Sequence, residues 1–174
     1  MKQKTPGAIP ADFDAAVAVV LHRTTGHGDL LSTLLAGWTT LDGRDAVDGD
    51  VLRGGTIYVA PAEMHMTVTA GRRIALVRGG LIHHVLSSAD PLFTSAALAF
   101  GSHCIAVVLT GHDGDGSTGV RAVRREGGTV IAENPETALT GSMPSSAIAT
   151  GCVDQILDLR DIAPALVQLL DAPI

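Results

Sequence analysis

Two aspartates separated by one glycine follow an apolar run in the second half of the chain. The stretch 105–119 reads IAVVLTGHDGDGSTG and places Asp113 and Asp115 just before a helical pattern that begins at Val120. Such apolar runs are typical of buried parallel strands. In open α/β sheets, the binding and catalytic residues lie at the carboxyl ends of the strands. The two carboxylates therefore indicate one of three features: a helix cap, a metal ion, or a histidine that one of them orients.

Three kinds of site on this loop are considered in turn. The first is a dinucleotide site, because Gly114, Gly116 and Gly119 match the G-x-G-x-x-G pattern between a strand and a helix. Glu133 ends the next predicted strand, where a ribose-binding acid is expected. Asp115 lies inside the turn, however, where a pyrophosphate would bind. Its carboxylate would repel that ligand and cancel the favourable field of the helix N-terminus. We therefore expect no cofactor.

The second alternative is a metal site built from His112, Asp113 and Asp115. A calcium loop needs more oxygen ligands than this stretch offers, and the glutamate that closes such loops is missing at the right distance. Zinc would need a second histidine, and the sequence has no pair of histidines at positions i and i+4. We therefore expect no bound metal.

The third alternative is a histidine–carboxylate pair, as in the general base of a Ser-His-Asp hydrolase. His22 ends the apolar run 15–21, so it reaches the same edge of a parallel sheet as Asp115. A hydrolase would also need a serine nucleophile on a third loop. Against this, Asp115 could simply cap the helix that begins at Gly116, and a lone histidine is more often structural. The other histidines lack patterned partners and are interpreted as structural or solvated: His27, His65, His83, His84 and His103.

Composition limits the class of protein. The 174 residues are 46% hydrophobic but only 3% aromatic, which predicts one domain with an aliphatic core. The net charge of -6 argues against a nucleic-acid or anionic-membrane partner. The sequence has neither a signal peptide nor an apolar run of membrane-spanning length, so we expect a cytoplasmic protein that is not inserted in a membrane. Cys104 and Cys152 are expected to be reduced, buried thiols.

The elements that must position these residues alternate along the chain with short glycine-containing turns. This alternation predicts an α/β fold, doubly wound, with a mainly parallel sheet and helices on both faces. The expected strands are 15–21, 105–109, 129–132 and 153–157, and the expected helices are 27–38, 90–100, 116–126, 144–150 and 161–170. The short runs 56–60, 67–69 and 73–77 are interpreted as a small hairpin-rich insertion. Asp90 is expected to cap its helix, with Ser87 and Ser88 as capping or turn residues before it.

Six segments follow one another in a characteristic order. They are VVLH at 19–22, GTIYVAP at 55–61 with HM at 65–66, SADPLF at 88–93, VLTG and GDG within 108–116, GGTVIA at 127–132, and MP and AI within 143–148. Together they resemble the catalytic domain of the CheB family, the chemotaxis receptor methylesterases. The resemblance runs from about Ile9 to Leu170, which leaves residues 1–8 as a polar N-terminal tail and 9–174 as the methylesterase-like domain.

The resemblance implies a protein-glutamate methylesterase of bacterial chemotaxis adaptation. Such an enzyme hydrolyses glutamyl methyl esters on methyl-accepting chemotaxis receptors and releases methanol. The resemblance also implies that His22 is the general base, that Asp115 fixes its tautomer, and that the backbone of Gly111 and His112 lies beside the oxyanion. The family is normally controlled by a phosphorylatable receiver module, for which this sequence shows no sign.

The chain departs from the family at four places. His112 replaces a methionine, Thr24-Thr25 a proline pair and Leu86-Ser87 an Arg-Pro pair. The family's nucleophile is a serine in a glycine-rich turn after the first strand, but no serine or cysteine precedes His22 here. We therefore expect the family's first strand to be absent and the esterase to be impaired, with a non-catalytic receptor- or partner-binding homologue as the alternative. Loss of an interior strand would either leave two unpaired edges or force the neighbouring strands to pair directly, so we also expect a homodimer or a remodelled sheet.

Overall fold

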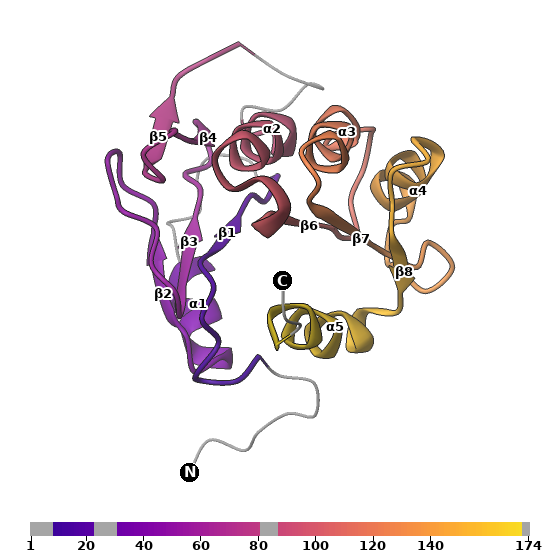
Figure 1. Cartoon of the computed structure of the whole chain (residues 1–174), viewed down its shortest axis with the longest axis horizontal. Coiled ribbons are helices and arrows are strands. Elements are labelled where there is room, and N and C mark those ends of the chain that lie inside the picture. Colours follow the sequence, from indigo (N-terminus) through magenta and orange to yellow (C-terminus); the bar gives the residue numbers. More distant parts are fainter. Residues whose placement is uncertain (1–8, 23–30, 81–86, 172–174) are drawn as a thin grey trace.

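The computed structural model describes residues 9–22, 31–80 and 87–171, which form an α/β fold as predicted (Figure 1). The strands are β1 (Val17–Val19), β2 (Asp42–Asp45), β3 (Thr56–Val59), β4 (His65–Val68), β5 (Ile74–Val77), β6 (Ile105–Val108), β7 (Thr129–Glu133) and β8 (Gln155–Leu157). The helices are α1 (Leu31–Trp38), α2 (Ala89–Phe100), the 3-10 turn η1 (Gly101–His103), α3 (Ser117–Arg125), α4 (Ser142–Ala149) and α5 (Leu159–Asp171). None of the helices in these ranges has the length and apolar character needed to cross a membrane.

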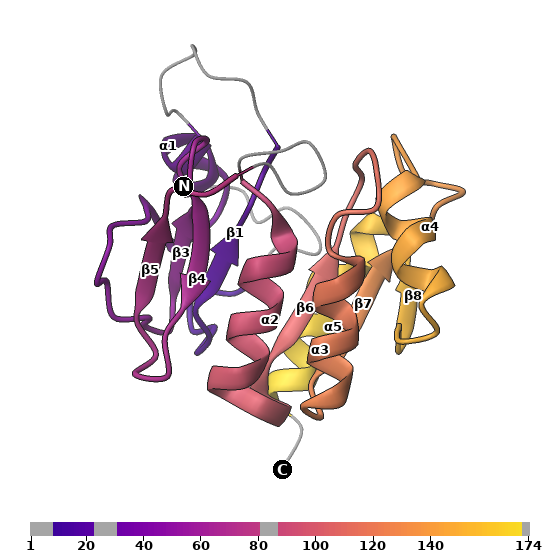
Figure 2. The same cartoon turned by 90° about the horizontal axis from the view of Figure 1, so that it is seen from above.

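The parallel strands form two separate three-stranded sheets. One has the order β1-β3-β2 and the other the order β6-β7-β8, and β4 and β5 make an antiparallel hairpin. Ala18 of β1 is in register with Tyr58 of β3, and Ala106 of β6 is in register with Val130 of β7. Helices α2, α3 and α4 lie on one side of the sheets and α5 lies on the other (Figures 1 and 2). The predicted covering of both faces is confirmed.

A division separates the two parallel sheets between β1 and β6. In the part of the chain that the structure describes, β1 pairs only with β3 and β6 only with β7. Helix α2 packs across the division, because its Ala96 and Phe100 contact the apolar clusters of both sheets. On the opposite face, Leu166 and Val167 of α5 pack against the first sheet, and α5 also contacts β7 and β8. The direct pairing of β1 with β6 that a remodelled sheet would require is therefore not found among the described residues, and each of these strands keeps one unpaired edge.

Two expectations about the first half of the chain are wrong. The run 56–60 does not belong to a hairpin insertion, because β3 is the buried central strand of a parallel sheet. Only the runs around 67–69 and 73–77 form the hairpin. Strand β2 was not expected, since its sequence DGRD has no apolar pattern. Strand β2 exists because β3 offers it a pairing edge, which is a tertiary effect that periodicity does not report.

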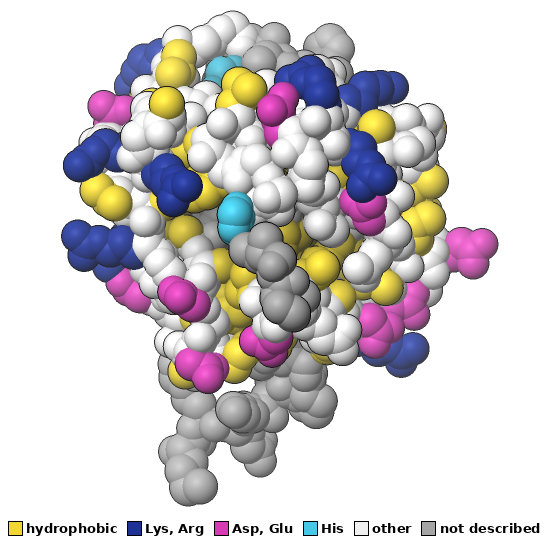
Figure 3. All heavy atoms as spheres, viewed as in Figure 1, with side chains coloured by type: hydrophobic (Ala, Val, Ile, Leu, Met, Phe, Trp, Pro, Cys, Tyr) yellow, Lys and Arg dark blue, Asp and Glu magenta, His cyan; other side chains and the backbone are white. Residues whose placement is uncertain are grey.

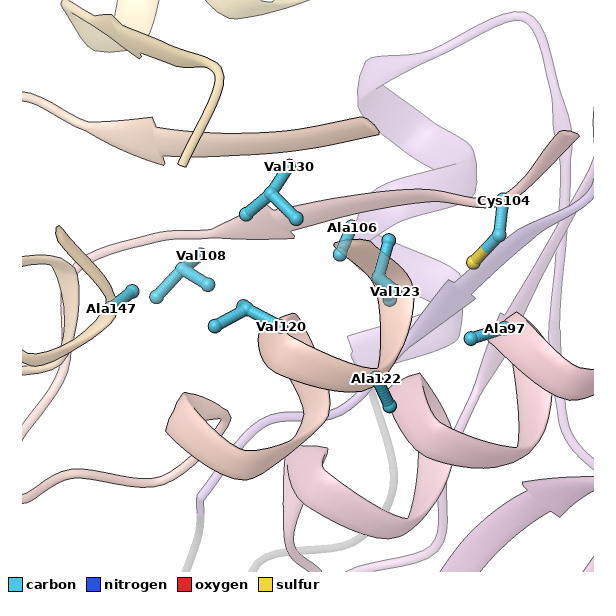
Figure 4. Close-up of a cluster of buried hydrophobic side chains, with 9 residues drawn as sticks. All are labelled: Ala97, Cys104, Ala106, Val108, Val120, Ala122, Val123, Val130 and Ala147. Atoms are coloured by element: carbon cyan, nitrogen blue, oxygen red, sulfur yellow. The ribbon is translucent and has the colours of Figure 1, made fainter. Parts of the chain in front are cut away.

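The core is mainly aliphatic, as the composition predicts, and Phe13 and Tyr58 are its buried aromatic residues in the described part of the chain. Figure 4 shows nine buried side chains between β6, β7 and the helices, and none of them is aromatic. Cys104 is buried among them, and burial raises the pKa of its thiol to about 11. Both cysteines are free thiols, and Cys152 is only partly buried, so the expectation of buried cysteines is confirmed for Cys104 alone.

Helices α2 and α3 lie side by side and approach closely at Gly119 (Figure 2). A Cβ added at Gly119 would lie 2.5 Å from the Cβ of Phe93. That neighbour cannot move without the backbone of α2. The Gly119 N–H also donates to Oδ1 of Asp90 at 2.7 Å, which ties the first turn of α3 to the first turn of α2.

We expect Gly119→Ala to lower the free energy of unfolding by about 2 kcal/mol, because the added methyl group overpacks the crossing of the two helices. The matched control is Gly37→Ala in α1, where a Cβ would meet nothing within 4 Å. That substitution is expected to be neutral or to stabilise by up to about 1 kcal/mol, since alanine is the better helix former. Urea unfolding of both variants measures the difference, and equal values would contradict the close crossing.

Candidate active site

His22 and Asp115 meet at the carboxyl ends of the two strands that flank the division. His22 follows β1, and Asp115 lies on the loop between β6 and α3. Nε2 of His22 lies 2.7 Å from Oδ2 of Asp115, although 93 positions separate the two residues. The His22 side chain is 25% exposed and that of Asp115 is fully buried. The convergence expected from the sequence is therefore confirmed.

The orientation of the imidazole leaves one nitrogen for chemistry. Since Nε2 of His22 faces the Asp115 carboxylate, Nδ1 is the nitrogen that could take a proton from a reacting group. In the Ser-His-Asp template the carboxylate meets Nδ1 instead. The pairing here fixes the ring and its tautomer in the same way, with the roles of the two nitrogens exchanged.

The Asp115 carboxylate lies at the N-terminus of α2. Its Oδ2 also accepts the Ala89 N–H at 2.7 Å, and its Oδ1 accepts the Ser88 hydroxyl at 2.5 Å and the Asp90 N–H at 3.4 Å. An anion at this point is favoured by the unsatisfied N–H groups and by the helix dipole. Asp115 therefore caps a helix, but not the one that the sequence suggested, because Gly116 occupies the cap position of α3.

The start of α2 also differs from the prediction. The N-cap residue is Ser88, whose hydroxyl accepts the Asp90 N–H at 3.2 Å, whereas Asp90 lies in the first turn. The expectation that Asp90 caps the helix is therefore wrong, and the capping role expected of Ser88 is confirmed. The local pattern offered two good caps, Ser88 and Asp90, and tertiary contacts decided between them, since Asp90 accepts the Gly119 N–H instead.

The pKa of Asp115 is lowered from its ordinary value of 3.8. Burial by itself disfavours the charged form and raises the pKa, but the hydrogen bonds from Ala89, Ser88 and His22, together with the charge of His22, outweigh it. Asp115 is therefore ionised at neutral pH. An ionised carboxylate can both orient a histidine and stabilise the imidazolium that forms when the histidine takes a proton.

The loop before Asp115 provides one candidate oxyanion donor. The Gly111 N–H donates to the Thr140 carbonyl at 3.0 Å, so that group is already used. In the described part of the chain, the backbone N–H of His112 makes no hydrogen bond, and the His112 side chain is exposed. Of the two residues expected beside the oxyanion, only His112 has its N–H available. Asp113 follows with φ 64°, a left-handed conformation that aspartate tolerates better than most residues.

The groups that a dinucleotide would need are engaged elsewhere. The Gly119 N–H is bonded to Asp90, and Glu133 is 3% exposed and accepts the Thr110 N–H at 2.7 Å. Neither the helix N-terminus nor the acid can then face a ligand as a Rossmann site requires. Within the described ranges, no three His, Cys, Asp or Glu side chains are placed to hold a metal ion.

Sequence reasoning missed the close contact of Ser88 with Asp115. From the sequence, Ser88 is expected only as a capping or turn residue, because its approach to the loop after β6 depends on how α2 packs.

His65 is a buried structural residue: its Nε2 donates to the Gly80 carbonyl at 3.0 Å, and its Nδ1 accepts the Ser88 N–H at 3.3 Å. His103 lies in η1, and three other histidines lie outside the described residues: His27, His83 and His84. Thr24, Thr25 and Leu86 also lie outside them, whereas Ser87 is buried.

We expect Asp115→Asn to lower the free energy of unfolding at neutral pH by about 2 kcal/mol, since it removes a buried charge that accepts several hydrogen bonds. Because the folded-state pKa of Asp115 lies below 3.8, its contribution is complete above that pH and is lost as the pH falls further. The difference between wild type and variant should therefore shrink in acid. Urea unfolding at about pH 7 and about pH 3 tests this.

The control for that experiment is Asp113→Asn on the same loop. Asp113 is exposed, and asparagine tolerates its left-handed conformation, so the substitution should change stability by less than about 0.5 kcal/mol at either pH. Equal effects of the two substitutions would refute the capping role of Asp115.

Comparison with known proteins agrees with this site. The family model described as CheB methylesterase matches residues 3–166. A protein-glutamate methylesterase/protein-glutamine glutaminase of Pyrococcus horikoshii is 35% identical over 165 residues, which cover 93% of this chain and 45% of the relative. The protein-glutamate methylesterase FrzG of Myxococcus xanthus is 34% identical over 163 residues, covering 94% and 49%. The chain thus spans about half the length of the curated relatives it matches.

A solved structure matches over a larger share of its own length. The crystal structure of the Thermotoga maritima CheB methylesterase catalytic domain matches with a TM-score of 0.90 at 34% identity, covering 94% of this chain and 88% of that one. The agreement of sequence, fold and family model over nearly the whole chain is decisive, and the chain belongs to the CheB methylesterase family.

Proposed function

We propose that this chain is the catalytic-domain part of a protein-glutamate methylesterase of chemotaxis adaptation, acting on glutamyl methyl esters of the cytoplasmic part of chemoreceptors. The observation that carries the proposal is the contact of 2.7 Å between His22 and the buried, ionised Asp115. The names of the relatives support the substrate class. A cytoplasmic location follows from that substrate.

In the proposed reaction, Nδ1 of His22 takes the proton of a hydroxyl nucleophile as its oxygen attacks the ester carbonyl. The tetrahedral oxyanion is stabilised by the backbone N–H of His112. The C–O bond to the methoxy group then breaks, and His22 returns the proton so that methanol leaves. Water, deprotonated by His22 in turn, hydrolyses the acyl intermediate, which restores the hydroxyl and leaves a free glutamate. Asp115 stays ionised throughout and stabilises the imidazolium.

The nucleophile is the group that this geometry still needs. No serine or cysteine precedes His22, and Ser32, the first serine after it, is buried in α1. We propose that the hydroxyl arrives on a parallel strand seated between β1 and β6. Both strands have an unpaired edge there within the described residues, and α2 and α5 pack over the two faces of the division.

The side chains beside this division suit such an occupant. The residues of β1 are apolar but only half-buried, and Ile105 and Val107 of β6 are half-buried as well. Hydrophobic side chains are visible at the surface between β1 and α5 (Figure 3). Because His22 and Asp115 follow the two flanking strands, a parallel strand between them would end beside the pair. Without that strand, residues 1–174 are expected to be catalytically impaired.

A complementation experiment tests the proposed role of the pair. The chain alone should neither release methanol from a methylated receptor nor react with a fluorophosphonate. With an added peptide made of an apolar strand and a Gly-x-Ser-x-Gly turn, the peptide serine should become labelled. The labelling should fall at least about a hundredfold in His22→Ala, and a peptide with alanine in place of its serine is the control.

Two results would contradict this proposal. Labelling of the peptide that does not depend on His22 would exclude the pair as general base. Receptor binding by the chain and peptide without any labelling would instead favour a non-catalytic, receptor-binding homologue, which the missing nucleophile would also explain.

The unpaired strand edges also lead us to propose self-association. Unpaired edges of apolar strands favour pairing with another chain, so we expect a homodimer in solution. Light scattering coupled to gel filtration should give twice the mass of 17.8 kDa. Addition of the strand peptide should lower the measured mass to that of one chain plus one peptide, since the peptide and the second chain would compete for the same strand edges. A monomer at every concentration would contradict the dimer.

A further inference from the structure

Ser88 joins three parts of the site at one buried point. Its side chain is fully buried, and its hydroxyl donates to Oδ1 of Asp115 at 2.5 Å while accepting the Asp90 N–H at 3.2 Å. Its own backbone N–H donates to Nδ1 of His65 at 3.3 Å. His65 is thereby connected through Ser88 to Asp115, which contacts His22.

These contacts determine the direction of the Ser88 hydroxyl. The oxygen accepts the Asp90 N–H, so the hydroxyl proton must point elsewhere, and Oδ1 of Asp115 is the acceptor in reach. On the other side, His65 holds the Ser88 backbone. Its Nε2 donates to the Gly80 carbonyl, which leaves Nδ1 without a proton and able to accept the Ser88 N–H.

The hydroxyl in turn determines how the carboxylate is rotated. Oδ2 of Asp115 is shared by His22 and the Ala89 N–H, whereas Oδ1 has the Ser88 hydroxyl and only a long contact, 3.4 Å, with the Asp90 N–H. Without the hydroxyl, Oδ1 would keep that weak contact alone. The carboxylate could then turn toward the remaining N–H groups of α2 and away from the imidazole.

We propose that Ser88 is a positioning residue: its hydroxyl fixes the plane of the Asp115 carboxylate so that Oδ2 meets Nε2 of His22. The inference rests on the proposed function, since only a catalytic pair needs this orientation, but it does not depend on the origin of the nucleophile. The Ser88 hydroxyl thus has two separate effects: it orients the Asp115 carboxylate, and it caps α2 by accepting the Asp90 N–H.

The test is nuclear magnetic resonance of the His22 Nε2 proton in the full chain. A histidine N–H hydrogen-bonded to a buried carboxylate gives a downfield signal that exchanges slowly with water, and its absence in His22→Gln assigns it. In Ser88→Ala, we expect this proton to exchange about tenfold faster and to lose part of its downfield shift. Ser88→Thr, which keeps the hydroxyl, should restore both.

Two further variants separate positioning from stability. Ser88→Gly lacks the hydroxyl but remains a good helix cap, so it should show the same change in the signal with only a small loss of stability. Ser95→Ala is the matched control in α2. The Ser95 hydroxyl donates to the Pro91 carbonyl and accepts the Val68 N–H, and neither group belongs to the His22–Asp115 pair. It should leave the His22 signal unchanged.

An unaltered His22 signal in folded Ser88→Ala and Ser88→Gly would overturn the proposal, and so would an equal change in Ser95→Ala. These outcomes are independent of turnover. If the peptide-complemented chain does not hydrolyse esters but the signal changes as expected, the proposed function fails, and Ser88 orients the Asp115 carboxylate without a catalytic role.

Discussion

The buried carboxylate of Asp115 is the interaction on which the arrangement of the site depends. It lies at the N-terminus of α2, where three donors from Ser88, Ala89 and Asp90 reach its two oxygens. A buried charge is unfavourable unless it is fully hydrogen-bonded, and the start of a helix supplies such donors in a fixed geometry. The carboxylate thereby connects the loop after β6 to α2 and, through His22, to the end of β1.

This connection spans the division between the two parallel sheets. The described strands on either side do not pair with each other, so no strand pairing joins the two sheets in this part of the chain. Helices α2 and α5 hold the halves together by apolar packing, and the His22–Asp115 contact adds a polar link at the strand ends. The candidate site is thus located where the parallel strands are not paired, at the division where the proposed function needs a further strand.

The predictions that failed share one physical cause. Asp90 was expected to cap α2, and capping of α3 was the alternative considered for Asp115, because both residues lie just before helical patterns. In the structure, Gly116 adopts φ 87° at the start of α3, which turns the preceding aspartate toward α2. Helix caps were inferred from residues that are neighbours in the sequence. A buried carboxylate instead accepts hydrogen bonds from the donors that tertiary packing places beside it, as the α2 donors beside Asp115 show. Strand β2 was missed for a similar reason, since it depends on its pairing with β3.

The sequence by itself determined the α/β class, the aliphatic core and the placement of His22 and Asp115 after strands. Apolar runs, glycine turns and the parallel alternation of elements encode those features locally. It also showed that no serine or cysteine precedes His22. Only the tertiary structure decided that the sheet is divided, that Asp115 caps α2, and that Ser88 and His65 support the carboxylate. Those features depend on packing between segments distant in the chain, which residue patterns do not encode.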